Sequence, residues 1–274
     1  MNKEIYYFSG SGNSLAVARN IAEKINAKLI PVASIIDQTS ISTDADIIGF
    51  VFPIYDFKPP LLIRNFVEKF ENLKSKYIFA VCTYGIIPSK AIRSFEKSIQ
   101  SCGGELSGGF AVKMPHNGIG SGSFSQTQHE IMFKNWKTKL EAISKYIIAG
   151  EKGKFETSDM FFSLVLSGVF IEMMPTIMRL FKQVIMKGWK SIAFISNKEC
   201  DGCGICKKIC IVDNIEIVDN KPSWSSHCAG CFACFHWCPK GAIQLGNTNM
   251  NIKQYHHPEA KIVDMLEQKG YGNN

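Results

Sequence analysis

The stretch Ile5-Tyr6-Tyr7-Phe8-Ser9-Gly10-Ser11-Gly12-Asn13-Ser14 decides the fold of the first half of this 274-residue chain. Its first four residues are bulky and apolar without polar alternation, which is typical of a central strand covered on both faces. Its last six residues are small and mostly polar, and Leu15, Ala18, Ala22 and Ile25 then recur at helical spacing. The stretch therefore predicts a strand, a tight loop and a helix in immediate succession.

The same alternation of strand and helix continues toward residue 150. Three further runs have strand character: Ile47–Phe52, Tyr77–Cys82 and Gly109–Met114. The longest helix carries its apolar stripe over residues 132–147, and Ser125 and Gln128 are placed to form a capping box at its start. Strands that alternate with helices predict an α/β fold with a doubly wound parallel sheet, which we expect to have five strands.

The glycine–serine loop stands where the N–H groups of a helix N-terminus and serine hydroxyls can bind a phosphate. It does not match a dinucleotide-binding loop because Leu15 occupies the position of the third glycine, and no lysine follows to complete a nucleotide P-loop. The alternative is a plain turn with solvated serines.

The loop resembles the flavodoxin phosphate loop, and the matching residues are Ser9, Ser11, Gly12, Asn13 and Ser14. This resemblance implies a flavodoxin-like fold and bound FMN, with the isoalloxazine ring held by the loops after the third and fourth strands. Those loops are Pro53, Ile54, Tyr55, Asp56 and Phe57, and Thr83, Tyr84 and Gly85. Ligands of parallel α/β sheets bind at the carboxyl ends of the strands, where both loops are expected.

Eight of the ten cysteines fall in an internal repeat. One copy is Cys200-Asp201-Gly202-Cys203-Gly204-Ile205-Cys206-Lys207-Lys208-Ile209-Cys210. The other is Cys228-Ala229-Gly230-Cys231-Phe232-Ala233-Cys234-Phe235-His236-Trp237-Cys238. Both read Cys-x2-Cys-x2-Cys-x3-Cys, the run that ligates [4Fe–4S] clusters in bacterial-type ferredoxins.

In that pattern three closely spaced cysteines hold one cluster, and the fourth turns away to hold the other. One predicted set is Cys200, Cys203, Cys206 and Cys238, and the other is Cys228, Cys231, Cys234 and Cys210. Paired zinc sites are an alternative, although structural zinc usually takes two Cys-x2-Cys pairs. One departure from the ferredoxin pattern is Ile211, which follows Cys210 where proline is usual.

The polar junction at residues 151–154 is the expected end of the first domain. We expect a flavodoxin-like FMN-binding domain over residues 1–150, a helical bridge over 151–193, a small α+β two-[4Fe–4S] ferredoxin domain over 194–246 and a tail over 247–274. Within the third of these segments the sequence predicts a hairpin over residues 215–224 that turns at Asp219 and Asn220, and a short strand over 242–245.

The formal net charge of +7 does not indicate a nucleic-acid partner. Thiolates on two oxidised clusters and an FMN phosphate would bring the loaded protein close to neutral. No basic segment followed by a long apolar one opens the chain, and no apolar run reaches the ~18 residues that span a bilayer. We therefore expect a cytoplasmic protein with no transmembrane segment, in which reduced cysteines bind metal and do not form disulfides.

Taken together, the loop and the repeat resemble the flavodoxin–ferredoxin fusion family of anaerobic bacteria and archaea. The resemblance implies an oxygen-sensitive electron-transfer protein that relays low-potential electrons between FMN and two [4Fe–4S] clusters, with redox proteins as donor and acceptor. The competing hypothesis is a ferredoxin-linked, flavin-dependent reductase of a small substrate, but Asp56 and His116 form no convincing acid–base pair, and we name no catalytic residue. A scaffold or sensor with redox-silent clusters is a third reading.

Overall fold

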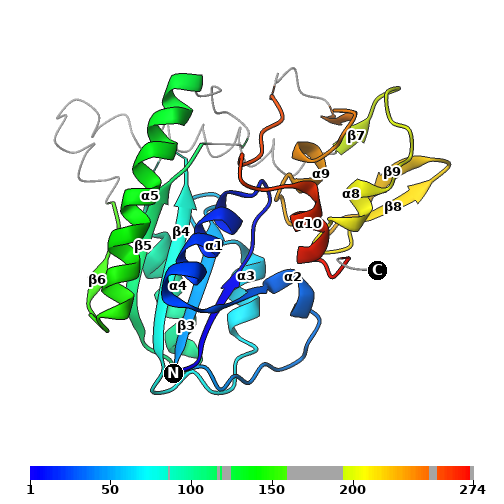
Figure 1. The fold of residues 1–274 in the computed structure, drawn as a ribbon. Coiled ribbons are helices and arrows are strands. Elements are labelled where there is room, and N and C mark those ends of the chain that lie inside the picture. The colour runs from blue at the N-terminus through cyan, green and yellow to red at the C-terminus, as the bar shows by residue number, and fades with distance from the viewer. Residues whose placement is uncertain (86, 116–117, 119–124, 159–193, 247–251, 272–274) are drawn as a thin grey trace, which may run out of the picture.

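The computed structural model describes residues 1–85, 87–115, 118, 125–158, 194–246 and 252–271. Its largest element is a six-stranded sheet in the order β2-β1-β3-β4-β5-β6, in which every neighbouring pair is parallel (Figure 1). The strands are β1 (Lys3–Tyr7), β2 (Lys28–Pro31), β3 (Ile47–Pro53), β4 (Tyr77–Tyr84), β5 (Leu106–Lys113) and β6 (Lys154–Phe155). The order 2-1-3-4-5 of the first five is the flavodoxin-like doubly wound arrangement. The α/β parallel fold predicted for this part of the chain is confirmed.

Helices cover both faces of the sheet, as the unalternated strands require. The helices are α1 (Asn13–Ile25), α2 (Val32–Ile35), α3 (Leu61–Val67), α4 (Ala91–Ser101) and α5 (Gln126–Ile148). Along β1, Ile5 and Tyr7 pack in a core with α1 and α5, whereas Tyr6 belongs to the opposite core with α3 and α4. Successive side chains of a strand point to opposite faces, so each strand contributes to both cores.

The sheet has one strand more than the sequence predicted. β6 pairs through Lys154 and Phe155 with Gly108 and Gly109 of β5, so the predicted count of five strands is wrong. A two-residue strand is too short to show a periodicity, which explains why the pattern did not predict it.

The predicted start of the long helix is confirmed in detail. The Ser125 hydroxyl accepts a hydrogen bond from the Gln128 N–H at 3.2 Å, and the Gln128 side chain accepts one from the Ser125 N–H at 2.8 Å. This capping box satisfies two N–H groups that the first turn of α5 would otherwise leave unpaired.

Residues 194–246, which we name the cysteine module, form short elements around the repeat. The elements are β7 (Phe194–Ser196), α8 (Ile205–Lys208), β8 (Ile215–Val218), β9 (Lys221–Trp224), α9 (Ala233–His236) and β10 (Ile243–Leu245). β7 and β10 pair in antiparallel fashion, and β8 and β9 form the predicted hairpin. Asp219 and Asn220 have φ angles of 48° and 58°, as the tight turn of such a hairpin requires.

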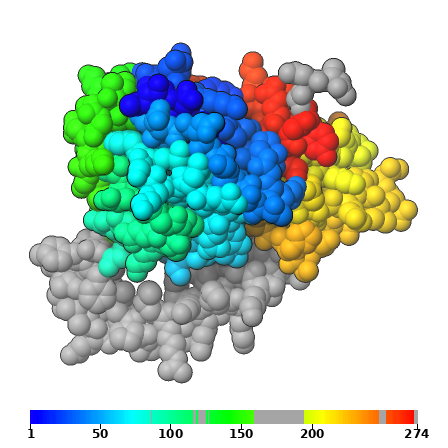
Figure 2. All heavy atoms as spheres, turned by 90° about the horizontal axis from the view of Figure 1, so that it is seen from below, coloured from blue at the N-terminus to red at the C-terminus, as the bar shows by residue number. Residues whose placement is uncertain are grey.

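The C-terminal segment 252–271, which we name the tail, includes helix α10 (Ile262–Gln268). Figure 2 shows the tail in red between the first elements of the chain, in blue, and the cysteine module, in yellow. Most of the predicted helical bridge, residues 159–193, lies outside the described residues. Within the described parts of the chain, no helix is long and apolar enough to cross a membrane.

Candidate functional site

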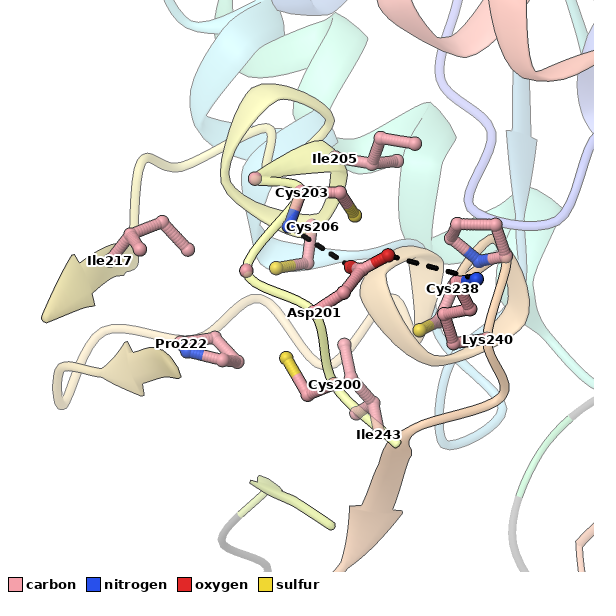
Figure 3. Close-up of a pocket in the computed structure, with 13 residues that line it drawn as sticks. Cys200, Asp201, Cys203, Ile205, Cys206, Ile217, Pro222, Cys238, Lys240 and Ile243 are labelled. Carbon is pink, nitrogen blue, oxygen red and sulfur yellow. Dashed lines mark hydrogen bonds and ion pairs between the residues drawn. The ribbon is translucent and has the colours of Figure 1, made fainter. Parts of the chain in front are cut away.

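Two cavities in the cysteine module divide the eight repeat cysteines into two sets of four. The first cavity is lined by Cys200, Cys203, Cys206 and Cys238, whose side chains surround a common space in Figure 3. The second is lined by Cys210, Cys228, Cys231 and Cys234. The two hollows are alike in extent, at about 340 and about 310 Å³ when the solvent at their open sides is counted. Each cavity thus takes three cysteines from one copy of the repeat and one from the other.

The backbone around the two cavities repeats as the sequence does. The sulfur of Cys210 accepts a hydrogen bond from the Asn214 N–H at 3.2 Å, and the sulfur of Cys238 accepts one from the Ala242 N–H at 3.3 Å. Both donors lie four residues after the cysteine that crosses between the copies. N–H groups directed at thiolate sulfurs are a feature of metal–sulfur sites, where they stabilise negative charge.

The cysteines that raise one another's pKa values fall in the same two sets. Burial, together with the neighbouring Cys203, Cys238 and Cys200, raises the pKa of Cys206 to about 11. Burial, together with the neighbouring Cys210 and Cys228, raises the pKa of Cys231 to about 12. Four thiolates gathered around one such space would need a compensating positive charge, which a bound metal would supply.

The sulfurs of the first set stand apart around a shared space (Figure 3). Within the described residues, no group of three or more His, Cys, Asp or Glu side chains is gathered closely enough to hold a single metal ion.

The second cavity also contains buried N–H donors that lack partners. Asn214 and Trp224 both line this cavity. Among the residues that the structure describes, the side-chain Nδ2 of Asn214 and the indole Nε1 of Trp224 are buried without a hydrogen-bond partner. Buried donors are rarely left unpaired in folded proteins, so these two fit a ligand with acceptor atoms in the cavity.

The glycine–serine loop lies at the carboxyl edge of the sheet and contacts the ends of two other strands. The Ser14 and Thr83 hydroxyls are hydrogen-bonded at 2.8 Å, and the Asn13 amide donates to the Pro115 carbonyl at 3.1 Å. The side chains of Ser9, Ser11, Asn13 and Ser14 are all buried. The loop therefore meets the carboxyl end of β4 and the segment after β5, where the predicted flavin site was expected.

The loop after β3 lies beside the second cysteine cavity. Tyr55 packs edge-on against Phe8, with ring centroids 6.2 Å apart. Burial raises the pKa of the Tyr55 hydroxyl well above its ordinary value, and the nearby Cys231 and Cys228 raise it further. Tyr55, one of the expected flavin-ring residues, is thus brought close to two cysteines of the second set.

Asp56 and Phe57 form the tip of this loop in an uncommon backbone conformation. Their φ angles are 49° and 61°, and the backbones of Tyr55 and Lys58 are hydrogen-bonded in both directions at 3.0 Å. Phe57 is half exposed. The pKa of Asp56 is raised by burial and lowered in part by Lys58. Left-handed non-glycine pairs cost energy and are concentrated at ligand-binding loops. Pro53, Ile54, Tyr84 and Gly85 are partly buried nearby.

The C-terminal tail covers the glycine–serine loop, which the sequence did not predict. The Gln268 side chain accepts from the Ser9 N–H at 3.1 Å and donates to the Ser9 carbonyl at 3.2 Å. The Tyr255 hydroxyl donates to the Asn13 side chain at 2.7 Å. These partners are separated by 259 and 242 positions in the chain, and no local pattern connects them.

The cysteine module also contacts the loop directly. The Trp237 indole donates to the Gly10 carbonyl at 2.9 Å, and a Cβ on Gly10 would overlap the Cys231 carbonyl. Ile211, the departure from the ferredoxin pattern, is buried in the same apolar core as Phe8. A proline at this position could not supply the same branched aliphatic surface to that core. This contact gives a physical reason for the departure.

Comparison with known proteins adds solved structures of low similarity. No profile of a known family matches the chain, and no curated protein matches it. A flavoprotein from Bacteroides uniformis is 19% identical over 48% of this chain and 98% of its own, with a TM-score of 0.35. A Streptococcus pneumoniae flavodoxin is 19% identical over 52% and 99%, with a TM-score of 0.33. An FMN-dependent NADH-azoreductase from Bacillus anthracis is 10% identical over 54% and 99%, with a TM-score of 0.38. The fold assignment therefore rests on the strand order and does not depend on these likenesses.

Proposed function

We propose that this chain is an electron-transfer protein that holds two [4Fe–4S] clusters in its cysteine module and FMN at the carboxyl edge of its sheet. The observation that carries the proposal is the division of eight cysteines between two similar cavities, each with one cysteine taken from the opposite copy of the repeat. Clusters and flavin, when bound, supply one-electron and one- or two-electron chemistry respectively.

The residues of the cysteine module would hold and shield the clusters. In this proposal Cys200, Cys203, Cys206 and Cys238 ligate one, and Cys210, Cys228, Cys231 and Cys234 ligate the other. Ile209, Phe232 and Trp237 are buried close by and would exclude water from the sulfurs. A dry surround and directed N–H groups control the reduction potential of such centres.

The residues of the glycine–serine loop would hold the FMN phosphate. The first N–H groups of α1 receive no side-chain cap, and the Ser9 hydroxyl lies at the same helix start, where it accepts from the Gly12 N–H at 3.0 Å. The ring would lie near Tyr55, Phe57 and Tyr84, of which Tyr55 is close to Cys231 and Cys228 of the second set. Redox proteins would act as donor and acceptor, and the division into residues 1–150 and 194–246 as two cofactor-holding domains is part of the proposal.

Anaerobic purification followed by metal, sulfide and flavin analysis tests the proposal. We expect about eight irons, about eight sulfides and one FMN per chain, and EPR signals from reduced [4Fe–4S] clusters. Stoichiometric zinc without iron would refute the cluster assignment. For the flavin, FMN should bind more tightly than riboflavin, because only FMN has the phosphate that the loop would bind. Equal affinity for the two would contradict the assigned role of the loop.

A further inference from the structure

The two cysteine cavities differ in the side chains that line them besides cysteine. The second cavity is lined by Asn214 and Trp224, each with a polar N–H group, whereas the hairpin residues that line the first are the apolar Ile217 and Pro222. Lys240 also lines the first cavity, but it is largely exposed and lies 3.8 Å from the Asp201 carboxylate, so solvent and Asp201 offset its charge.

Asn214 is held so that its NH2 group remains available. The residue is fully buried, and its side-chain oxygen accepts a hydrogen bond from the His227 N–H at 2.9 Å. That bond fixes which end of the amide is oxygen, so Nδ2 is the end left without a partner among the described residues. The His227 ring is also hydrogen-bonded to the Val212 carbonyl at 2.9 Å. This second hydrogen bond holds His227, whose N–H donates to Asn214, in place.

The repeat supplies an internal comparison for Asn214. It lies four residues after Cys210, and its N–H donates to that sulfur. The equivalent residue of the other copy is Ala242, which donates in the same way to Cys238. The backbone contribution is therefore the same in both copies, and only Asn214 adds a side-chain donor.

Trp224 places a second donor at the same cavity. Its indole Nε1 is buried without an ordinary hydrogen bond to any described residue, and it faces the sulfur of Cys234. Phe194, which also lines the cavity, packs against its ring at a centroid distance of 6.0 Å. The indole is therefore held against the cavity by a neighbouring ring.

We infer that Asn214 and Trp224 donate hydrogen bonds to sulfur atoms in the second cavity and raise the reduction potential of the cluster held there. An extra electron makes a cluster more negative, and N–H dipoles that point at its sulfurs stabilise the reduced form more than the oxidised form. The donors act on this site alone because the first cavity has no equivalent side chains among the residues that line it. This inference rests on the proposed cluster-binding function.

An EPR-monitored redox titration of the loaded, full-length protein tests the inference. Asn214→Ala introduces alanine, the residue at the equivalent position 242 of the other copy. Trp224→Phe removes the indole N–H while the aromatic packing is kept. Each should lower the potential of one cluster by about 59 mV, which equals a tenfold change in its reduction equilibrium for one electron. The cluster that shifts should be the one lost in Cys234→Ala, and the potential of the other should not move.

Val218→Ala is the matched control, because Val218 is exposed on the same hairpin and lines neither cavity. It should leave both potentials unchanged. If Asn214→Ala prevents cluster assembly, Trp224→Phe alone decides the matter. Full iron content with both potentials unchanged in the two donor variants would overturn the inference. Absence of iron from the wild-type protein would instead overturn the proposed function on which it rests.

Discussion

At Gly12 the glycine–serine loop meets the tail, and both the backbone conformation and the packing disfavour a side chain. Its φ angle is 91°, and a Cβ would lie 2.6 Å from the Cβ of Ala260. The flavodoxin pattern assigns this glycine to phosphate binding, whereas the structure shows a second constraint on it, close packing against the C-terminal segment. Phosphate binding and close packing against the tail are thus two separate reasons for a glycine at position 12.

Gly12→Ala should destabilise the protein more than Gly103→Ala does. Gly103 has a similar φ angle of 74° but nothing within 4 Å of its Cβ position, so it isolates the backbone effect. We expect a backbone cost of about 1 kcal/mol at Gly103, and about 1–3 kcal/mol more at Gly12 from overpacking. Urea unfolding measures both. Equal losses would show that the tail does not press on the loop.

His257, also in the tail, predicts a loss of stability in acid. It is buried between Phe133 and Trp136, with ring centroids 5.0 and 5.2 Å away, and burial lowers its pKa to about 4. An unfolded histidine takes up a proton below about pH 6.5, whereas the folded one stays neutral until about pH 4. The free energy of unfolding should therefore fall as the pH drops below 6.5, and the loss due to His257 should reach about 3 kcal/mol at pH 4.

Comparing the free energies of unfolding of the wild type and His257→Asn from pH 7 to pH 4 isolates the contribution of His257. Asparagine keeps an acceptor for the Glu259 N–H, which His257 Nδ1 accepts at 3.2 Å, but it does not titrate. The stability difference between the two proteins should narrow as the pH falls. Parallel pH profiles would contradict the assignment.

At the scale of elements, four strands of the sheet, the longest helix and the helical stretch before Gln268 followed from the sequence pattern. Two features did not follow: β6, which has only two residues, and the position of α10, which is set by contacts with the other end of the chain. The hairpin was predictable because two residues fix its turn chemistry locally. The attachment of the tail was not, because Gln268 is an ordinary helical residue until Ser9 is beside it.

Gln268→Leu should weaken this attachment with little change in side-chain size. It removes both hydrogen bonds to Ser9 and leaves a buried N–H and a buried carbonyl without partners. We expect a loss of about 2–4 kcal/mol in the free energy of unfolding. Val263→Ala on the exposed face of the same helix is the control and should cost less than about 1 kcal/mol. Similar losses for the two variants would show that the pair of bonds contributes nothing.

At the scale of the whole molecule, the two halves of the chain meet at the glycine–serine loop and at the second cysteine cavity. The sequence predicted the two cysteine sets through the repeat, and the structure gathers the same sets around two cavities. The sequence could not predict which set faces the sheet, because that depends on contacts such as Trp237 with Gly10. The arrangement brings Tyr55, in the loop after β3, close to Cys231 and Cys228 of the second set.

The interleaving of the two cysteine sets is tested most directly by EPR of reduced single-cysteine variants. Cys210 belongs to the first run of sequence but lines the second cavity. The spectrum of Cys210→Ala should therefore match that of Cys234→Ala and differ from that of Cys206→Ala, while Cys102→Ala, outside the module, keeps both signals. A Cys210→Ala spectrum that matches Cys206→Ala instead would mean that each run of cysteines holds its own cluster, and the interleaved ligand sets would be wrong.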